Sequence, residues 1–300
     1  MIELENLTAV SNTQQDFLGH LMWFSVGKQL IKTDELENKL NNAGLDSIWM
    51  PNPIRSTDAF RRATKEMEQR KATSQPNVFQ NVLMREVYAD KEAVQRNIVV
   101  ETVDQNGKRL SYSPQSAVIT LDKNKDHVTF VTEDAMIEEI CQEAEHKFNL
   151  YKNHYSAQQL RVMVNKNLQS LAPTPVRKNG GIYFVPAPKS PDLLKLVQFI
   201  SSLDDSEGYK VPVIDSADNR TMVNEKLTEH FDSILDDCRQ RGNLKKGEMK
   251  MLVGEANRVI KDYRNYKSIV TEEAQQMEQK IMQIRSEVTR IMGDRDECKH

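Results

Sequence analysis

The strongest hydrophobic pattern lies near the C-terminal end of the sequence. Between Val253 and Ile291, apolar residues recur at alternating spacings of three and four, and only Lys267 interrupts them. A strict repeat of seven residues keeps one apolar seam against a partner helix. The pattern therefore predicts one long helix, from about residue 246 to residue 292, with coiled-coil packing.

Two partners fit this seam. One is a helix predicted over Met222 to Cys238, which would form a helical hairpin with it. The other is a second copy of the chain. Parallel pairing would set Glu273 against Glu278 and Lys280 against Arg285, and both contacts repel. Antiparallel pairing sets Glu278 against Arg285 and Lys280 against Glu287, at about 0.3 kcal/mol per exposed pair. The residues expected at this dimer interface are Val270, Met277, Ile281, Ile284, Val288 and Ile291.

The first part of the sequence shows helical patterns. Residues 13–31 carry a wide apolar face, a short helix follows Thr33 and stops at Gly44, and a third helix runs from a capping Ser56 to about Lys71. These patterns predict a helical N-terminal part.

Residues 78–132 change to short β-prone runs, with Asn106-Gly107 as a hairpin turn between two of them. They predict an antiparallel meander of about four strands. The runs are Val82–Tyr88, Ile98–Val103, Ala117–Leu121 and Val128–Val131.

The middle of the sequence returns to helical spacing. One helix is predicted around Met136 to Tyr151, and a second begins at Ser156 and ends before Pro173. A hairpin with Asn179-Gly180 at its turn follows, and then a helix capped at Ser190. Helix, helix, hairpin and helix is the order of a winged-helix unit.

Together these elements predict an α+β fold with three modules. Residues 1–132 form a helical and antiparallel-sheet module, residues 133–216 a winged-helix-like module, and residues 217–300 a helical hairpin or coiled coil.

Composition narrows the class of protein. Forty-one Lys and Arg against 44 Asp and Glu leave a net charge of −3, so a nucleic-acid surface would have to be local. Cys141, Cys238 and Cys298 fit neither a disulfide framework nor a zinc site. Gly19 and His20 break the longest N-terminal apolar stretch. We therefore expect a cytoplasmic protein without a signal peptide or membrane span.

Catalytic motifs are absent from the sequence. It contains no glycine-rich phosphate loop, nucleophile elbow or paired Cys-x-x-Cys, and its six histidines are dispersed. Glu143 and His146 form a single Glu-x-x-His spacing, whereas a di-iron bundle needs two. We therefore expect no metal, no cofactor and no enzymatic activity. A hydrolase or nuclease would require residues that meet only in the tertiary structure.

Two basic clusters could contact phosphate groups. One lies on the third predicted helix and includes Arg61 and Arg62. The other lies on the winged-helix-like unit. Acidic residues are interspersed with both clusters, so solvated charged faces are the alternative. The second cluster consists of Arg161, Lys166, Arg177 and Lys178.

Two segments resemble a known group of proteins. Ile54-Arg55-Ser56-Thr57-Asp58-Ala59-Phe60-Arg61-Arg62-Ala63 and Gly180-Gly181-Ile182-Tyr183-Phe184-Val185-Pro186 are similar, in that order and separation, to segments of uncharacterised proteins of bacteriophages and mobile elements of Gram-positive bacteria. The resemblance covers most of residues 10–215. It implies a viral or plasmid setting but no activity and no catalytic residues.

Two functions follow as expectations. The first is a non-enzymatic phage-type interaction or scaffold protein of the host cytoplasm, which oligomerises or docks a protein partner through its C-terminal helices. The alternative is a nucleic-acid-binding protein of phage DNA metabolism or regulation, which uses the winged-helix-like unit.

Overall fold

The computed structural model describes residues 17–177, 180–240, 245–271 and 273–297. Within them the fold is a mixture of helices and antiparallel sheets, as predicted for the fold class. None of the helices in these ranges is long and apolar enough to cross a membrane.

The chain divides into two compact units that interleave in the sequence. Unit 1 comprises Met1–Gln29, Glu37–Met50 and Leu160–His300, and unit 2 comprises Leu30–Leu36 and Pro51–Gln159. Unit 2 is thus inserted into the sequence of unit 1, whereas the three predicted modules follow one another along the chain.

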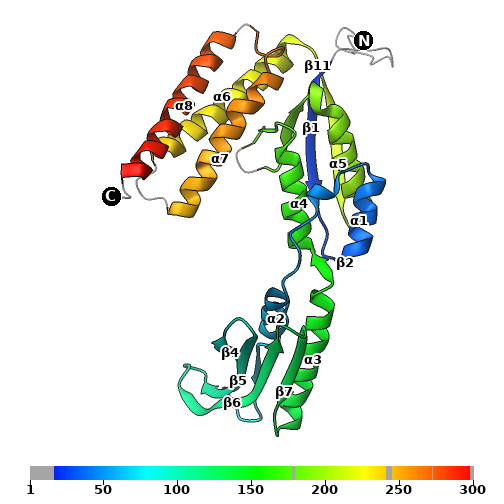
Figure 1. The fold of residues 1–300 in the computed structure, drawn as a ribbon, viewed down its shortest axis with the longest axis vertical. Coiled ribbons are helices and arrows are strands. Elements are labelled where there is room, and N and C mark those ends of the chain that lie inside the picture. The colour runs from blue at the N-terminus through cyan, green and yellow to red at the C-terminus, as the bar shows by residue number, and fades with distance from the viewer. Residues whose placement is uncertain (1–16, 178–179, 241–244, 272, 298–300) are drawn as a thin grey trace, which may run out of the picture. The chain divides into compact units, whose positions relative to one another are not determined.

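Unit 1 is built on a four-stranded antiparallel sheet in the order β11-β1-β10-β9 (Figure 1). Its central strands approach closely at Gly19, where a Cβ atom would lie 2.2 Å from the carbonyl oxygen of Val185. The strands are β1 (Phe17–Ser25), β9 (Thr174–Pro175), β10 (Tyr183–Pro186) and β11 (Glu207–Ile214).

The predicted helix over residues 13–31 is wrong. Its described residues form β1, followed by β2 (Leu30–Lys32), while residues 13–16 lie outside the described residues. β1 pairs with β10 on one side and with β11 on the other. A central strand covered on both faces has a continuous apolar run, which periodicity alone cannot distinguish from a buried helix.

Among the elements between β1 and β11 in the sequence are three helices and one further short strand. The start at Thr33 and the stop at Gly44 are confirmed, since α1 covers Thr33–Asn42 and Gly44 has a φ of +71°. Ser190 does not cap its helix, because its hydroxyl bonds to His20 instead. The remaining elements are α4 (Ala157–Gln169), α5 (Ser190–Ser202) and β8 (His154–Ser156), which pairs with β2.

The predicted hairpin around residues 176–185 is present but is no separate wing. β10 pairs with β9 on one side and with β1 on the other, so the hairpin forms one edge of the four-stranded sheet. The first helix of the predicted winged-helix-like module belongs to unit 2 and the later elements to unit 1. The winged-helix order therefore does not form a module of its own, and the sequence did not predict β11.

The C-terminal part of unit 1 is a bundle of three helices (Figure 1). The predicted single helix over residues 246–292 is wrong, because the chain leaves the helix at Tyr263–Asn265 and turns back before α8. The bundle consists of α6 (Ala217–Arg239), α7 (Lys246–Asp262) and α8 (Ala274–Glu297). Gly242, the predicted end of the first of them, lies outside the described residues.

The seam packs within one chain. α8 contacts α6 and α7, so the predicted partner helix over Met222 to Cys238 is confirmed. The charges of the antiparallel-dimer prediction find other partners: Lys280 bonds to Asp232 of α6, and Lys267 lies 3.7 Å from Glu278. A dimer through this seam would require the bundle to open. The buried seam residues are Val270, Met277, Ile281, Ile284, Val288 and Ile291, each at most 6% exposed.

Unit 2 contains a five-stranded antiparallel meander in the order β3-β4-β5-β6-β7, which confirms the predicted meander. Asn106-Gly107 turns between β5 and β6, with a φ of +81° at Gly107. The predicted third helix is too long, since α2 ends at Lys65 and the following residues form β3. The strands are β3 (Gln69–Ala72), β4 (Val78–Ala89), β5 (Ala93–Asp104), β6 (Arg109–Asp122) and β7 (His127–Val131).

Two helices cover one face of this meander. They are α2 (Ser56–Lys65) and α3 (Ala135–Tyr151). Phe60 of α2 packs edge to face on Phe148 of α3, with 6.4 Å between the ring centroids. Ile98 and Ile119 of the sheet are fully buried in the same core. The core therefore occupies one side of the sheet, and neither α2 nor α3 covers the other side.

Candidate nucleic-acid interface

The side of the meander that faces away from α2 and α3 carries polar and aromatic residues. Residues directly opposite one another in antiparallel strands share a side. Arg70, Asn81, Glu101 and Tyr112 form one such row across four strands. We call this side the outer face. The outer face includes Arg70, Phe79, Asn81, Arg85, Glu101, Arg109 and Tyr112.

Two arginines of the outer face stack on aromatic rings. The guanidinium carbon of Arg70 lies 4.3 Å from the ring centroid of Phe79, and that of Arg109 lies 4.4 Å from that of Tyr112. Tyr112 is 50% exposed. Each exposed cation–π contact contributes about 0.5–1 kcal/mol and holds the guanidinium group over the ring. The face thus presents two cationic, planar platforms.

The outer face has a surplus of positive charge. These seven residues include three arginines and one carboxylate, Glu101, and a second carboxylate of the same side, Asp122, lies opposite Ala93. Glu101 accepts hydrogen bonds from the amide of Asn81 and from Nε of Arg109, both at 3.0 Å. The Asn81 amide, followed by Arg109, holds the pKa of Glu101 below its usual range, and Arg85 adds to this effect. The carboxylate is therefore ionised at neutral pH and orients Arg109.

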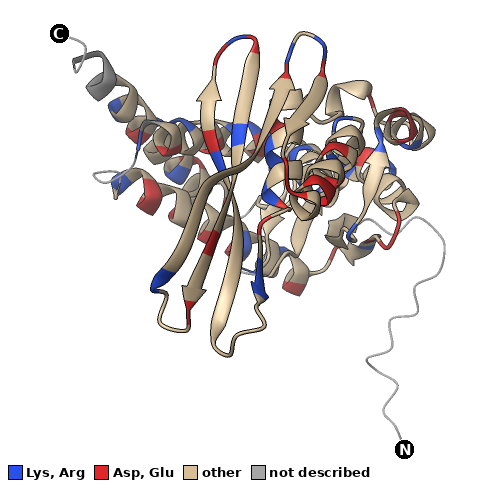
Figure 2. Cartoon of the chain, turned by 90° about the horizontal axis from the view of Figure 1, so that it is seen from below, with Lys and Arg blue, Asp and Glu red and all other residues tan. Residues whose placement is uncertain are grey.

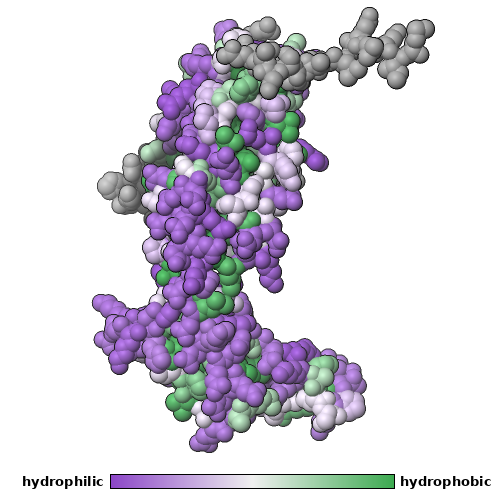
Figure 3. All heavy atoms as spheres, turned by 90° about the vertical axis from the view of Figure 1, so that its right-hand side faces the viewer, coloured by the Kyte–Doolittle hydropathy of each residue, from purple (hydrophilic) through white to green (hydrophobic). Residues whose placement is uncertain are grey.

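Figure 2 shows this meander seen from below, with charges of both signs on its strands and hairpins. The face drawn in Figure 3 has apolar side chains in small groups among hydrophilic ones.

Arg61 and Arg62 lie on α2 rather than on the outer face. Nε of Arg61 lies 3.3 Å from a carboxylate oxygen of Glu86, and Nε of Arg62 lies 3.2 Å from one of Glu66. Arg62 also stacks over Tyr151 at 3.8 Å. Both arginines thus take part in ion pairs within unit 2. Their contact with nucleic acid stays a prediction.

The second predicted basic cluster lies in unit 1. Arg161 donates a hydrogen bond from Nη2 to the carbonyl oxygen of Val26 at 2.7 Å, which ties α4 to the end of β1. Lys166 and Arg177 are exposed, and Lys178 lies outside the described residues. The structure therefore engages Arg161 in the fold and leaves Lys166 and Arg177 facing solvent.

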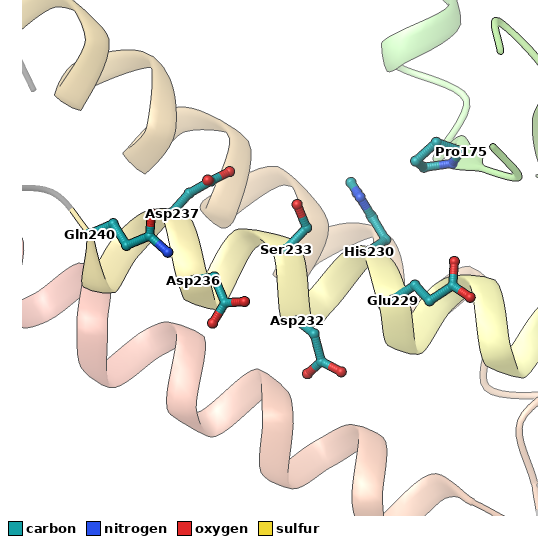
Figure 4. A pocket seen from close by; sticks show the side chains of 8 residues that line it. All are labelled: Pro175, Glu229, His230, Asp232, Ser233, Asp236, Asp237 and Gln240. Carbon is teal, nitrogen blue, oxygen red and sulfur yellow. The ribbon is translucent and has the colours of Figure 1, made fainter. Parts of the chain in front are cut away.

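A hollow along α6 has the opposite charge. It has a volume of about 610 Å³, and Figure 4 shows its side chains on α6 with Pro175 at one end. Burial, followed by the charge of Arg258, lowers the pKa of His230 to about 4, so the ring is neutral at pH 7. Four carboxylates repel phosphate, so this hollow is no nucleic-acid site. The lining residues are Pro175, Glu229, His230, Asp232, Ser233, Asp236, Asp237 and Gln240.

One Ser–His pair forms through the tertiary structure. The hydroxyl of Ser190 lies 3.1 Å from Nδ1 of His20, and His20 is 6% exposed. Burial, followed by the charge of Lys210, lowers the pKa of His20 to about 4. The pair joins the start of α5 to β1. No group of three or more His, Cys, Asp or Glu residues that could hold a metal occurs within the described ranges.

The sequence reasoning missed most of the outer face. Phe79, Tyr112 and Arg109 were not among its candidate residues. A period of two along β4 would have placed Phe79 and Asn81 on one side of a strand. Arg109 and Tyr112 are three residues apart, and only the irregular register opposite Thr102 and Val103 places them on the same side of β6. The period could not have identified that side as the one without helices.

Comparisons with known proteins give a family but no activity. No curated protein and no solved structure matches this chain. One family model, described as a family of unknown function (DUF6744), matches residues 17–297. The match spans both units and nearly all of the described residues. The chain therefore belongs to this uncharacterised family, DUF6744.

Proposed function

We propose that the outer face of unit 2 binds single-stranded nucleic acid. The observation that carries the proposal is the pair of stacked platforms, Arg70 on Phe79 and Arg109 on Tyr112. Unpaired bases stack on aromatic rings and on guanidinium planes, and the same guanidinium groups pair with phosphate. One face thus supplies both interactions that single strands need.

A sheet face suits a single strand better than a duplex. Reading a B-form duplex requires an element that enters the major groove, usually a helix or a two-stranded ribbon. The outer face instead presents side chains from four adjacent strands, β3 to β6. Splayed bases can lie across such a surface, as they do on other sheet platforms.

The charge of the face sets the expected strength. Three arginines would give about three phosphate contacts. Each contact with a single strand steepens the fall of log affinity with log salt concentration by a slope of about 0.7. Stacking adds about 1–3 kcal/mol for each base. Because the phosphate contacts release counterions, binding should weaken as the salt concentration rises.

Fluorescence anisotropy with a labelled single-stranded oligonucleotide tests the proposal. The variant Arg70→Ala/Arg85→Ala/Arg109→Ala should bind at least about tenfold more weakly. The slope of its log affinity against log salt concentration should be shallower by about 2. The matched control Lys65→Ala/Lys91→Ala/Lys125→Ala removes three exposed charges elsewhere in unit 2 and should bind as the wild type does. Equal losses in both variants would overturn the proposal.

The variant Arg61→Ala/Arg62→Ala tests the position of the interface. If α2 carries the phosphate contacts, this pair rather than the outer-face triple will weaken binding. In that case the function would stand and the outer face would be the wrong surface.

A second candidate function is docking of a protein partner on the bundle. Its inward seam is already packed, but Met251 of α7 and Met282 of α8 are 76% and 67% exposed. Flexible, polarisable methionine side chains are common on protein-binding surfaces. For this second function we infer that the chain is a phage-type scaffold protein in the host cytoplasm. Loss of a co-purifying host or phage protein in Met251→Lys/Met282→Lys, but not in Lys65→Glu, would support it.

A further inference from the structure

The strand β6 is longer than its neighbour β7. β7 pairs with β6 only between Val118 and Asp122. Beyond that point the β7 side of β6 has no strand beside it in unit 2, whose residues are all described. Residues 109–115 are all exposed. Alternate residues of a strand direct their N–H and C=O groups to each side, so this edge offers backbone hydrogen bonds to another chain.

Local contacts define the length of this open edge. The hydroxyl of Thr132 donates to the carbonyl oxygen of Ser116 at 2.9 Å, and Pro114 has no backbone N–H group to donate. These two features end the open edge beyond Ser113. The open part is therefore the five-residue segment 109–113.

A hollow lies where the open edge meets the end of β7. It has a volume of about 480 Å³. Hydroxyl groups of Ser113, Ser116 and Thr132 and apolar groups of Val118 and Val131 line it together. A strand that continues the line of β7 along β6 would pass this hollow and could place a side chain in it.

The side chains along the open edge suit a peptide strand. Leu110 and Tyr112 are 51% and 50% exposed and can make cross-strand contacts, which contribute about 0.2–1 kcal/mol each. Arg109 lies at one end of the edge, and Glu133 lines the hollow at the other end. The edge therefore carries opposite charges at its two ends.

We propose that this edge binds an extended peptide of a partner protein, which adds to the sheet as a strand antiparallel to β6. Its N-terminal end lies at Glu133 and carries a cationic residue, and its C-terminal end lies at Arg109 and carries a carboxylate. An antiparallel strand continues the direction of β7 and matches every other pairing in this sheet. Backbone bonds supply affinity in this mode, and side chains supply specificity.

Two synthetic peptides test the polarity. The first, Lys-Thr-Val-Thr-Val-Thr-Asp, has the proposed charges, and the second, Asp-Thr-Val-Thr-Val-Thr-Lys, reverses them. Binding to the full chain is measured by anisotropy, and contacts are located by amide shifts in nuclear magnetic resonance spectra. The first peptide should bind at least about fivefold more tightly, because it forms two favourable end contacts instead of two repulsive ones. Its shifts should centre on residues 109–113.

Variants separate the edge from other surfaces. Glu133→Lys should remove the preference for the first peptide, and Leu110→Lys should weaken both peptides. Lys65→Glu on α2 changes an exposed charge away from the edge and should leave binding unchanged. Equal binding of both peptides by the wild type would overturn the proposal. Shifts centred away from both residues 109–113 and the hollow would also overturn it. So would shifts at residues 109–113 that appear on self-association of the chain, or on addition of an oligonucleotide, but not on addition of either peptide.

Discussion

The hydroxyl group of Tyr266 donates a hydrogen bond to the carbonyl oxygen of Ala172 at 2.6 Å. The hydroxyl oxygen of Tyr266 also accepts a hydrogen bond from the hydroxyl of Thr174 at 2.8 Å, and the centroid of its ring lies 6.1 Å from that of Phe184. Tyr266 is 2% exposed, and burial raises its pKa well above the usual value. It sits in the turn between α7 and α8 and so joins the bundle to the sheet of unit 1.

Tyr266→Phe should destabilise unit 1. The substitution keeps the ring but leaves the buried Ala172 carbonyl and the Thr174 hydroxyl without their partner, at a cost of about 1–3 kcal/mol. Urea unfolding followed by tryptophan fluorescence measures the change. Tyr263→Phe is the matched control, because its hydroxyl makes only a 3.4 Å contact with the Ala274 carbonyl. An equal loss in both variants would contradict the role assigned to Tyr266.

Ile284→Ala should destabilise the bundle without changing the oligomeric state. Ile284 is fully buried in the core of one chain, so its truncation leaves a cavity and costs about 2–5 kcal/mol. Met282→Ala, at an exposed position of the same helix, should cost less than about 0.5 kcal/mol. Urea unfolding gives the stability, and sedimentation equilibrium gives the mass. Dissociation of a wild-type dimer by Ile284→Ala would instead show that the seam joins two chains.

Stability should fall as the pH drops from about 6.5 to about 4. Burial lowers the pKa values of His20 and His230 to about 4 in the folded chain, while the unfolded chain binds these protons near pH 6.5. Between these values the unfolded state holds more histidine protons, so the free energy of unfolding rises with pH, and this histidine contribution ends below about pH 4. His20→Asn, which retains a group at the position of Nδ1, should reduce the slope of the urea midpoint against pH. A slope unchanged in both His20→Asn and His230→Gln would exclude this linkage.

Tyr112→Ala should weaken oligonucleotide binding without changing its salt dependence. The ring stacks bases but carries no charge, and its loss costs about 1–3 kcal/mol. Arg109→Ala should both weaken binding and lower the salt slope by about 0.7. Anisotropy titrations at several salt concentrations distinguish the two effects. Tyr209→Ala, at an exposed tyrosine of unit 1, is the control; a loss as large as that in Tyr112→Ala would move the interface away from the outer face.

Local sequence was sufficient for the meander and several helix ends. Asn106-Gly107 specifies its hairpin because glycine tolerates the positive φ found there. The apolar period of α3 placed Ile137, Ile140 and Phe148 in the core, as the structure confirms. Turns and amphipathic periods depend on neighbours in the chain, so the sequence by itself determined them.

The tertiary structure decided the features that depend on contacts between segments distant in the sequence. Residues 17–25 become a central strand because β10 and β11, far along the chain, pair with both of its edges. The heptad spacing continues through Tyr263, Lys267 and Val270, yet the chain turns there because Tyr266 gains buried partners beside the sheet. The outer face likewise exists only because α2 and α3 cover the opposite side. A periodic pattern shows that a face must be buried or free, but contacts between distant segments determine what covers it.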